Sequence, residues 1–394
     1  MTRALLALLI VSSAQAEEPA VRHARPDRAS GGSAAVVVDE GVALVHTAQL
    51  FPASGANEPA SQIDSVFNAL DAVLRAGESG LDRVVKLHVV VERADLAPLV
   101  REAFAKRVPD RDGPAWTFVV GKPARPGALV AIDAVATTDA KPAPGRVESP
   151  TNIKLLPVSR RGFATLPAGA RVFISGQAEP DDDLAAATRK TLESLENTLK
   201  HLGMNRDHIV QLKAFYQPAE SAEVVERATA QFFGEKAAPP LVLVEWKSPA
   251  SLPIEIELVA SSPDPAPKDA EAIEYLTPPG LSASPVFSRI ARVNRGDLVF
   301  VSGLVGSSET TGAEQVEAIF ADLKAILAES GSDFRHMAKA TYYVADDDAS
   351  KALNDLRPRH YDPARPPAAS KAAVAGVGLP GRSIEVDMIA VGKP

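Results

Sequence analysis

The sequence of 394 residues contains no cysteine, few aromatic residues (5%) and no excess of basic over acidic side chains. The absence of cysteine excludes disulfide bonds, thiolate metal sites and thiol catalysis, and suits an oxidising compartment because nothing can mispair there. The formal net charge of −8 argues against a nucleic-acid partner, since such proteins need a basic surface to displace counterions. With 46% hydrophobic residues, the composition is that of a globular protein.

The first sixteen residues have the pattern of a secretory signal peptide. Arg3 precedes an apolar run from Ala4 to Val11, and Ala14-Gln15-Ala16 matches the small-x-small pattern of a cleavage site. An uncleaved anchor is the alternative, but the run is far shorter than the about 20 residues of a membrane-spanning helix. We therefore predict cleavage after Ala16, a periplasmic or secreted location, and no membrane contact after removal of the signal.

A threefold internal repeat of about 126 residues fills the remainder of the chain. The strand-like run at Val42–Gln49 returns at Ala170–Gln177 and again at Asp297–Leu304. A helix with apolar residues at i, i+3, i+4 and i+7 follows in each copy. These helical patterns extend over Ile63–Leu74, Thr188–Leu199 and Val316–Leu327. The middle pattern is the weakest, because threonine replaces three of its apolar residues.

Three further elements keep their order in every copy. A β-rich run lies at Val84–Val91, Ile209–Tyr216 and Met337–Val344. A second amphipathic helix is predicted at Leu96–Ala105, Ala222–Phe233 and Ser350–Leu356. Each copy closes with a strand, at Leu129–Ala136, Pro253–Ala260 and Arg382–Val391. The closing strands carry an acidic residue at equivalent positions, namely Asp133, Glu257 and Asp387.

These patterns divide the chain into a signal peptide and three repeats. We assign residues 1–16 to the signal, 33–137 to a degenerate first repeat, 151–261 to the second and 281–393 to the third. The proline-rich stretches between the repeats have few large apolar residues and are typical of linkers.

The order strand, strand, helix, strand, helix, strand, strand, with Ser-Gly-Gln after the first hairpin, resembles the RidA (YjgF) family. The residues that carry the resemblance are Val172–Gln177, Leu298–Gly303, Ile254–Glu257 and Ile384–Asp387. In addition, Pro114-Ala115 and Pro367-Ala368 stand where that family has a Pro-Ala-Arg motif. The resemblance covers all three repeats.

The resemblance implies an α+β fold of three chorismate-mutase-like units, each a mixed sheet with two helices on one face. Three such units assemble around a threefold axis and thereby bury the open face of each sheet. We therefore predict that this chain alone forms an intramolecular pseudo-trimer and acts as a monomer. Fusion also allows each of the three clefts between units to diverge independently.

The resemblance also implies an activity, the hydrolysis of reactive enamines and imines without a cofactor. In that family, an arginine holds the substrate carboxylate, a glutamate positions the attacking water, and backbone amides near Ser-Gly-Gln orient the substrate. Such chemistry requires an anion anchor, a base and restricted geometry, because an iminium carbon is already electrophilic.

The first repeat lacks both functional side chains. Trp116 stands at the arginine position and Ala131 at the glutamate position, while Ser-Gly-Gln has become Thr47-Ala48-Gln49. An inactive cleft is therefore expected here, with Trp116 as a core residue. A small apolar pocket around Trp116 is the alternative.

The second repeat keeps the glutamate but not the arginine. Leu241 stands at the arginine position, whereas Glu255 occupies the glutamate position. Glu255 and Glu257 share one strand face, where two carboxyls could act as acid and base; a solvated edge is the alternative. The motif itself is intact at Ser175, Gly176 and Gln177.

The third repeat is the richest in candidate residues. Ser302 and Gly303 are kept, and Glu385 occupies the glutamate position. The arginine position is ambiguous: alignment on Pro367-Ala368 places Ala369 there, and alignment on Leu379-Pro380 places Lys371 there.

Three other observations bear on this third cleft. Lys371 could hold a carboxylate as a point charge, or could be a solvated strand residue. Arg365 lies near in sequence and could reach in. Phe287 stands where the family has a cleft-wall tyrosine.

We therefore predict an exported pseudo-trimer that binds small metabolites between its repeats. Loss of the arginine contact costs about 2–5 kcal/mol, so at most weak C=N hydrolysis is expected. One alternative is an active deaminase in which Glu385 or Glu255 acts with Lys371 or Arg365; another is a non-catalytic scaffold. No metal site is expected, because the histidines show no H-x-H or H-E-x-x-H spacing. No cofactor is expected either, because the chemistry that the resemblance implies needs none.

Overall fold

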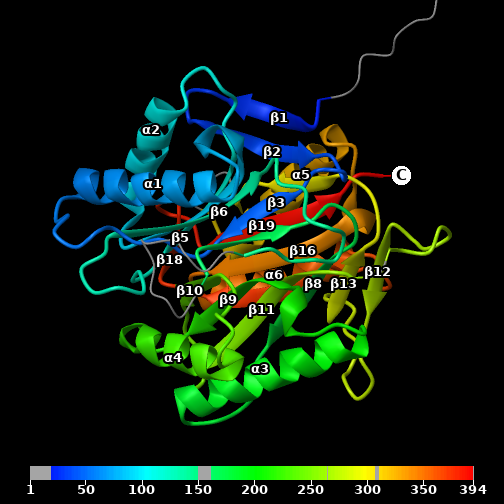
Figure 1. Cartoon of the computed structure of the whole chain (residues 1–394). Helices are drawn as coiled ribbons and strands as arrows, with labels where there is room; N and C mark the ends of the chain where they lie inside the picture. Colours follow the sequence, from blue (N-terminus) through cyan, green and yellow to red (C-terminus); the bar gives the residue numbers. More distant parts are fainter. Residues whose placement is uncertain (1–18, 150–160, 264, 307–309, 394) are drawn as a thin grey trace, which may run out of the picture.

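The computed structural model describes residues 19–149, 161–263, 265–306 and 310–393, so the predicted signal peptide lies outside the described residues. Three mixed β-sheets form the interior, and each carries two helices on its outer side (Figure 1). Figure 1 shows α1 and α2 of the first repeat and α3 and α4 of the second on different sides of the molecule. No helix of the described residues is long and apolar enough to cross a membrane.

The first sheet has the strand order β18-β5-β4-β6-β3-β7. Its strands are β3 (Leu44–Thr47), β4 (Val84–Val91), β5 (Ala115–Val120), β6 (Val130–Thr137), β7 (Phe163–Leu166) and β18 (Gly376–Val377). Strands β4 and β5 are parallel, and the other pairs are antiparallel. The sheet is covered by α1 (Pro59–Ala76) and α2 (Ala97–Arg107).

The second sheet has the order β10-β9-β11-β8-β13-β12. Its strands are β8 (Arg171–Gln177), β9 (Ile209–Tyr216), β10 (Leu241–Glu245), β11 (Ile254–Ser261), β12 (Ile273–Leu276) and β13 (Ile290–Val293). The covering helices are α3 (Leu184–His201) and α4 (Ala222–Phe233).

The third sheet has the order β1-β2-β14-β19-β16-β17, and β15 also pairs with β19. Its strands are β1 (Val21–Asp27), β2 (Gly32–Val38), β14 (Leu298–Val301), β15 (Leu304–Val305), β16 (Met337–Val344), β17 (Ala368–Ala373) and β19 (Ile384–Val391). The covering helices are α5 (Gly312–Glu329) and α6 (Asp347–Leu356). Short 3-10 turns lie at Leu81–Arg83, Ala94–Leu96, Arg206–His208, Ala219–Ser221, Phe334–His336 and Arg357–Arg359.

The first strands of each repeat do not form the hairpin that the sequence suggested. Strand β2 pairs with β14 of the third repeat, β7 with β3 of the first, and β13 with β8 of the second. Each repeat thus completes the sheet of the repeat before it, and the N-terminal strands close the ring on the third repeat. Main-chain hydrogen bonds therefore link all three units, which could not separate without breaking a sheet.

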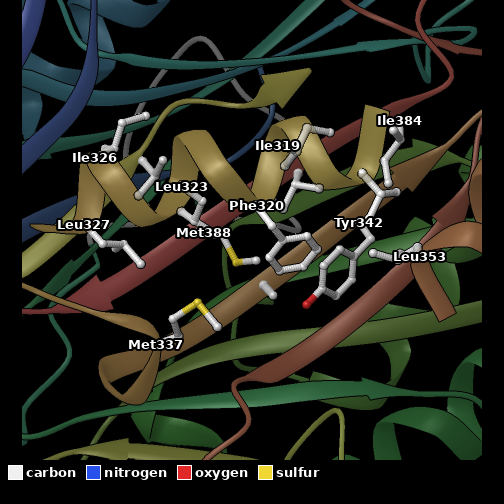
Figure 2. Close-up of a cluster of buried hydrophobic side chains, with 14 of the residues drawn as sticks. Ile319, Phe320, Leu323, Ile326, Leu327, Met337, Tyr342, Leu353, Ile384 and Met388 are labelled. Carbon is white, nitrogen blue, oxygen red and sulfur yellow. The ribbon is translucent and has the colours of Figure 1, made fainter. Parts of the chain in front are cut away.

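The outer layer confirms the helical patterns read from the sequence. Helix α5 turns Ile319, Phe320 and Leu323 toward Tyr342 and Met388 of the sheet beneath it (Figure 2). Thr311 and Glu314 form a capping box at its start.

The three threonines of α3 are buried, but each hydroxyl has a hydrogen-bond partner. Thr188 and Thr198 donate to main-chain carbonyls one turn earlier, and Thr191 accepts from the Glu179 amide. The weak middle pattern therefore packs without an unpaired hydroxyl on that helix.

The inner faces of the sheets meet at the centre of the molecule. One apolar cluster contains Val38 and Phe300 of the third sheet, Leu44 of the first and Phe173 and Val293 of the second. A second central cluster again combines side chains of all three sheets. The single chain therefore forms a pseudo-trimer, in which each open sheet face is closed by the other two.

Candidate functional site

Strand register fixes which residues are equivalent at the three repeat boundaries. Trp116 pairs with Leu87, and Leu241 with Leu212. In the third repeat Ala369 pairs with Ala340 at the same place. Ala369 is thus the equivalent of Trp116 and Leu241, and Lys371 stands two residues further along β17.

The cleft between the third and first repeats is built around Glu385. Its Oε1 atom accepts a hydrogen bond from the Phe118 amide (2.9 Å), and its Oε2 atom accepts one from the Gly378 amide (3.1 Å). Phe118 belongs to the first repeat, so the carboxyl of one repeat is held by the backbone of the next.

Ser302 and Gly303 join the same two repeats. The Ser302 hydroxyl donates to the Ser33 carbonyl (2.7 Å) and accepts from the Trp116 amide (2.9 Å). The Gly303 amide donates to the Trp116 carbonyl (2.6 Å). These groups are therefore engaged in holding the cleft walls together.

A glycine is required wherever the cleft contains a glutamate. A Cβ atom on Gly303 would lie 1.9 Å from Glu385 Oε1, and one on Gly176 would lie 1.9 Å from Glu255 Oε1. In the first repeat, where Ala131 replaces the glutamate, the equivalent position is Ala48. Space for the carboxyl therefore explains why two copies keep glycine and one does not.

Burial controls the protonation of Glu385, which is 3% exposed. Burial raises its pKa to about 7, and the two amide hydrogen bonds oppose this increase. Nearby Asp387 raises the pKa further, whereas Lys86 lowers it. A carboxyl with this pKa can both accept and donate a proton near neutral pH.

The sequence reasoning missed Arg101, which enters this cleft from α2. A cavity of about 350 Å³ is lined by Arg101, Phe118, Gly303, Leu379 and Glu385, among others. Apart from the exposed Asp95, its other lining residues are apolar side chains and glycine. The cleft thus combines one guanidinium and one buried carboxyl in an apolar surround.

Aromatic rings hold the guanidinium of Arg101. Its Cζ atom lies 5.2 Å from the ring centre of Trp116 and 5.0 Å from that of Phe118. Among the described residues it forms no hydrogen bond or ion pair. Burial lowers the pKa of Arg101, and the charges of Glu385 and Asp27 oppose that shift.

Gly32 leaves room for this arrangement. A Cβ atom there would lie 2.8 Å from Trp116 Cδ1 and 3.0 Å from Arg101 Nη1.

Comparison of the second helices of the first two repeats could have indicated Arg101 from the sequence. Ala97 and Val100 of α2 correspond in spacing and burial to Ala222 and Val225 of α4, so Arg101 stands where the second repeat has an acidic residue.

The cleft between the second and third repeats is built around Glu255. Burial raises the pKa of Glu255 to about 7, a hydrogen bond with Ser370 opposes this shift, and Glu257 adds to it. The Ser370 hydroxyl also accepts from the Gly176 amide (3.1 Å). The Ser175 amide donates to the Arg289 carbonyl (3.0 Å).

Phe287 lies beside this second cleft. Its ring centre is 5.0 Å from Arg289 Cζ, and the Arg289 charge lowers the pKa of Glu255. The Nε atom of Arg289 is buried and has no hydrogen-bond partner among the described residues. Arg289 is a second cation that the sequence reasoning did not assign.

The cleft between the first and second repeats contains the buried side chain of Gln49. Its Nε2 group donates to the Leu243 carbonyl (3.0 Å), and its Oε1 atom accepts from the Leu243 amide (3.3 Å). Leu243 is the equivalent of Phe118, so Gln49 takes the amide that Glu385 takes in the other cleft. Ala131 supplies no functional group.

Three predicted site residues contact other side chains of the protein. Lys371 Nζ donates to Ser350 Oγ (3.1 Å) and to Asn354 Oδ1 (3.3 Å), toward α6. Arg365 pairs with Glu271 (2.6 Å). Gln177 donates to Thr198 Oγ1 (2.7 Å) in the core of the second repeat. The anion-anchor roles suggested for Lys371 and Arg365 thus gain no support from their contacts.

Within the part of the chain that the structure describes, no group of three or more histidine, aspartate or glutamate side chains is arranged to hold a metal ion.

The family model described as Endoribonuclease L-PSP matches residues 163–262 and 281–392. Among curated proteins, Protein DfrA of Myxococcus xanthus is 33% identical over 113 residues, which cover 27% of this chain and 84% of that protein. Reactive Intermediate Deaminase A, chloroplastic, of Arabidopsis thaliana is 31% identical over 105 residues, which cover 25% of this chain and 55% of that protein.

Solved structures of similar proteins each cover about one third of the chain. A member of the YjgF protein family from Neisseria meningitidis is 28% identical and covers 31% of this chain and 96% of its own, with a TM-score of 0.24. A protein of the conserved Rid family from Yersinia pestis is 26% identical and covers 30% of this chain and 99% of its own, with a TM-score of 0.27.

Proposed function

Because the chain belongs to the RidA (YjgF) family, whose model is described as Endoribonuclease L-PSP, we propose that it binds small carboxylate metabolites between its third and first repeats and hydrolyses C=N bonds there. One observation carries the proposal: Arg101 and Glu385 line the same cavity of about 350 Å³. The name of the Arabidopsis relative, a reactive intermediate deaminase, supports the same class of reaction.

Arg101 is the anion anchor in this proposal. A half-buried guanidinium that forms no hydrogen bond or ion pair with any described residue favours a bound anion, because carboxylates accept two parallel hydrogen bonds from it. Trp116 takes the place of the family arginine in sequence, and its ring supports Arg101 in space. The largely apolar lining suits an acid with an apolar side chain.

Glu385 handles protons in the same cleft. In its ionised form, it accepts a proton from a water molecule that adds to the C=N carbon. In its protonated form, it donates that proton to the nitrogen, and the C–N bond breaks to release ammonia. The oxygen of the added water then gives its second proton to the carboxylate and becomes the carbonyl oxygen. A pKa of about 7 lets one carboxyl perform both steps near neutral pH.

The proposal places the protein outside the cytoplasm as a monomeric chain with a small-molecule partner. The N-terminal signal pattern supports export, and the internally closed ring supports action as a monomer. RNA cleavage is not proposed, because a net charge of −8 disfavours binding of a polyanion.

The test is an assay in which an amino-acid oxidase generates imines in place. The wild-type protein should accelerate imine loss over the free reaction, and Glu385→Gln should reduce this acceleration about 100-fold. Glu223→Gln, an exposed change on α4, is the matched control and should have no effect. If small acids raise the unfolding temperature but the protein does not accelerate imine loss, it is a binding protein and not an enzyme for these substrates. If the protein shows neither thermal stabilisation nor faster imine loss with any small acid, the result favours a non-catalytic scaffold.

A further inference from the structure

A layer of polar side chains lies on the central axis, between the two apolar clusters where the sheets meet. It surrounds a cavity of about 60 Å³. Its polar lining residues come from all three sheets: His46, Lys86, His88, Asp133, Gln211, Lys213, Glu257, Lys339, Thr341 and Asp387. The function proposed above does not use these groups.

Two ion pairs in this layer cross repeat boundaries. Lys86 of the first repeat binds Asp387 of the third (2.8 Å), and Lys339 of the third binds Glu257 of the second (2.6 Å). All four side chains have at most 12% exposure. Burial of four charges is costly, so this arrangement needs a compensating reason.

Among the described residues, the boundary between the first and second repeats has no equivalent ion pair. Gln211 stands at the position of Lys86 and Lys339, and its amide donates to the Thr47 carbonyl (2.7 Å). The equivalent carboxylate, Asp133, accepts a hydrogen bond from His88 of its own repeat (2.8 Å).

The two ion pairs occur at the boundaries whose clefts hold a glutamate. Side chains two residues apart on a strand share one face, with their Cα atoms about 7 Å apart. Asp387 thus shares the inner face of β19 with Glu385, and Glu257 shares that of β11 with Glu255. At the boundary with Gln211, the residue two positions before Asp133 is Ala131, which has no carboxyl.

We propose that Lys86–Asp387 and Lys339–Glu257 are positioning pairs, each of which sets the charge environment of the cleft glutamate on its own strand. The inference rests on the function proposed above for the cleft of Glu385. It adds an axial ion pair as a partner for Glu385 and, by the same geometry, for Glu255. The Lys86 ammonium group favours the ionised form of Asp387, and that negative charge opposes ionisation of Glu385.

The surroundings of Glu385 support this. Asp387 of β19, Lys86 of β4 and Arg101 of α2 carry charges that interact with Glu385. The charge of Glu385 in turn helps to raise the pKa of the Tyr343 hydroxyl group of β16, and Asp95 lines the same cavity. Burial alone would raise the pKa of Asp387, but Lys86, with Lys213 and Lys339 nearby, holds it at about 2. Asp387 therefore remains charged throughout the neutral range.

The charges of the pair give a test with opposite signs. The protein is labelled with ¹³C in its glutamate carboxyls, and the midpoint of Glu385 is followed by NMR without substrate, assigned by its loss in Glu385→Gln. Removal of the negative charge in Asp387→Asn should lower the midpoint by about one pH unit. Removal of the positive charge in Lys86→Met should raise it, because Lys213 and Lys339 still keep Asp387 ionised.

Matched variants exclude a purely structural effect. Gln211→Met alters the position equivalent to Lys86 at the boundary between the first and second repeats, and should leave the Glu385 midpoint unchanged. The double change of Lys86→Met and Asp387→Leu replaces the pair by apolar side chains, which often preserves folding, and should give an intermediate midpoint. The inference is overturned if the two single variants shift the midpoint in the same direction, if neither shifts it, or if the wild-type midpoint lies near that of an exposed glutamate.

The outcome is separable from that of the proposed function, because the titration requires no turnover. If the midpoints shift as expected but imines are not hydrolysed, the proposed activity is wrong and the positioning pairs are retained. If imines are hydrolysed but the Glu385 midpoint does not shift, the activity is retained and the positioning pairs are wrong.

Discussion

The clefts on either side of the first repeat share a backbone frame but differ in content. Between the third and first repeats, the Phe118 amide binds the Glu385 carboxyl, and the cleft remains open. Between the first and second repeats, the equivalent Leu243 amide binds the Gln49 side chain, which is fully buried. The same main-chain donor is thus satisfied in two ways, by a potential acid–base group or by an inert amide.

The difference shows how fusion changes a symmetric assembly. In a trimer of identical chains, every cleft must carry the same residues. In a single chain, Ala48 and Ala131 can replace glycine and glutamate at one boundary while Gly303 and Glu385 persist at another. A buried carboxyl is costly, so loss of the glutamate at one boundary also removes a destabilising group.

Removal of Arg101 should produce the largest effect on the open cleft. Arg101→Met should weaken the binding of small monocarboxylates by about 2–5 kcal/mol, since a partly desolvated charge contact is lost. Isothermal calorimetry measures this change. Lys371→Met is the control, because Lys371 contacts Ser350 and Asn354 instead. Equal weakening by both variants would contradict the assignment of Arg101.

The second effect is a pH dependence of stability caused by Glu385. Its pKa of about 7 exceeds its ordinary value of 4.5, so the folded state binds more protons than the unfolded state between these values. Stability should therefore fall as pH rises through this window, by at most about 3 kcal/mol for this group. Glu385→Gln should remove that loss, so the variant should gain on the wild type between pH 5 and pH 8 in urea unfolding. If the difference in stability between the variant and the wild type stays constant across this range, Glu385 does not have the raised pKa of a buried carboxyl.

A third experiment gives the cleft of Glu385 the residues found between the first and second repeats. Gly303→Ala should destabilise the protein by about 1–3 kcal/mol, because the added Cβ lies 1.9 Å from Glu385 Oε1. Adding Glu385→Ala reproduces the Ala48–Ala131 combination and should recover much of this loss. Urea unfolding of the two single variants and the double variant measures the coupling. Simple additivity of the two changes would show that the glycine is not kept for the glutamate.

The smallest effect is expected at Lys371. Its ammonium group interacts with side chains of α6 at the surface side of β17, so Lys371→Met should change stability by less than about 0.5 kcal/mol. Thermal unfolding and the imine assay should both stay near wild type. A large loss of activity would restore Lys371 as an anchor.

Much of the fold was accessible from the sequence because its signals are local. The β-rich runs at Val84–Val91, Ile209–Tyr216 and Met337–Val344 are strands with the same limits, and the three long helices cover the predicted stripes. Helix α6 starts at Asp347, before the predicted Ser350, because the Asp346 side chain caps it. The assigned repeat boundaries and the signal peptide remain predictions.

The sequence by itself determined that three similar units follow one another, since periodicity and capping depend on neighbours within a few turns of chain. Only the tertiary structure decided which strand completes which sheet, that Arg101 lies in the cleft of Glu385, and that Lys86 binds Asp387. Each of these contacts joins residues of different repeats, far apart in the chain. Their physical cause is closure of the ring, which brings together side chains that no local pattern relates.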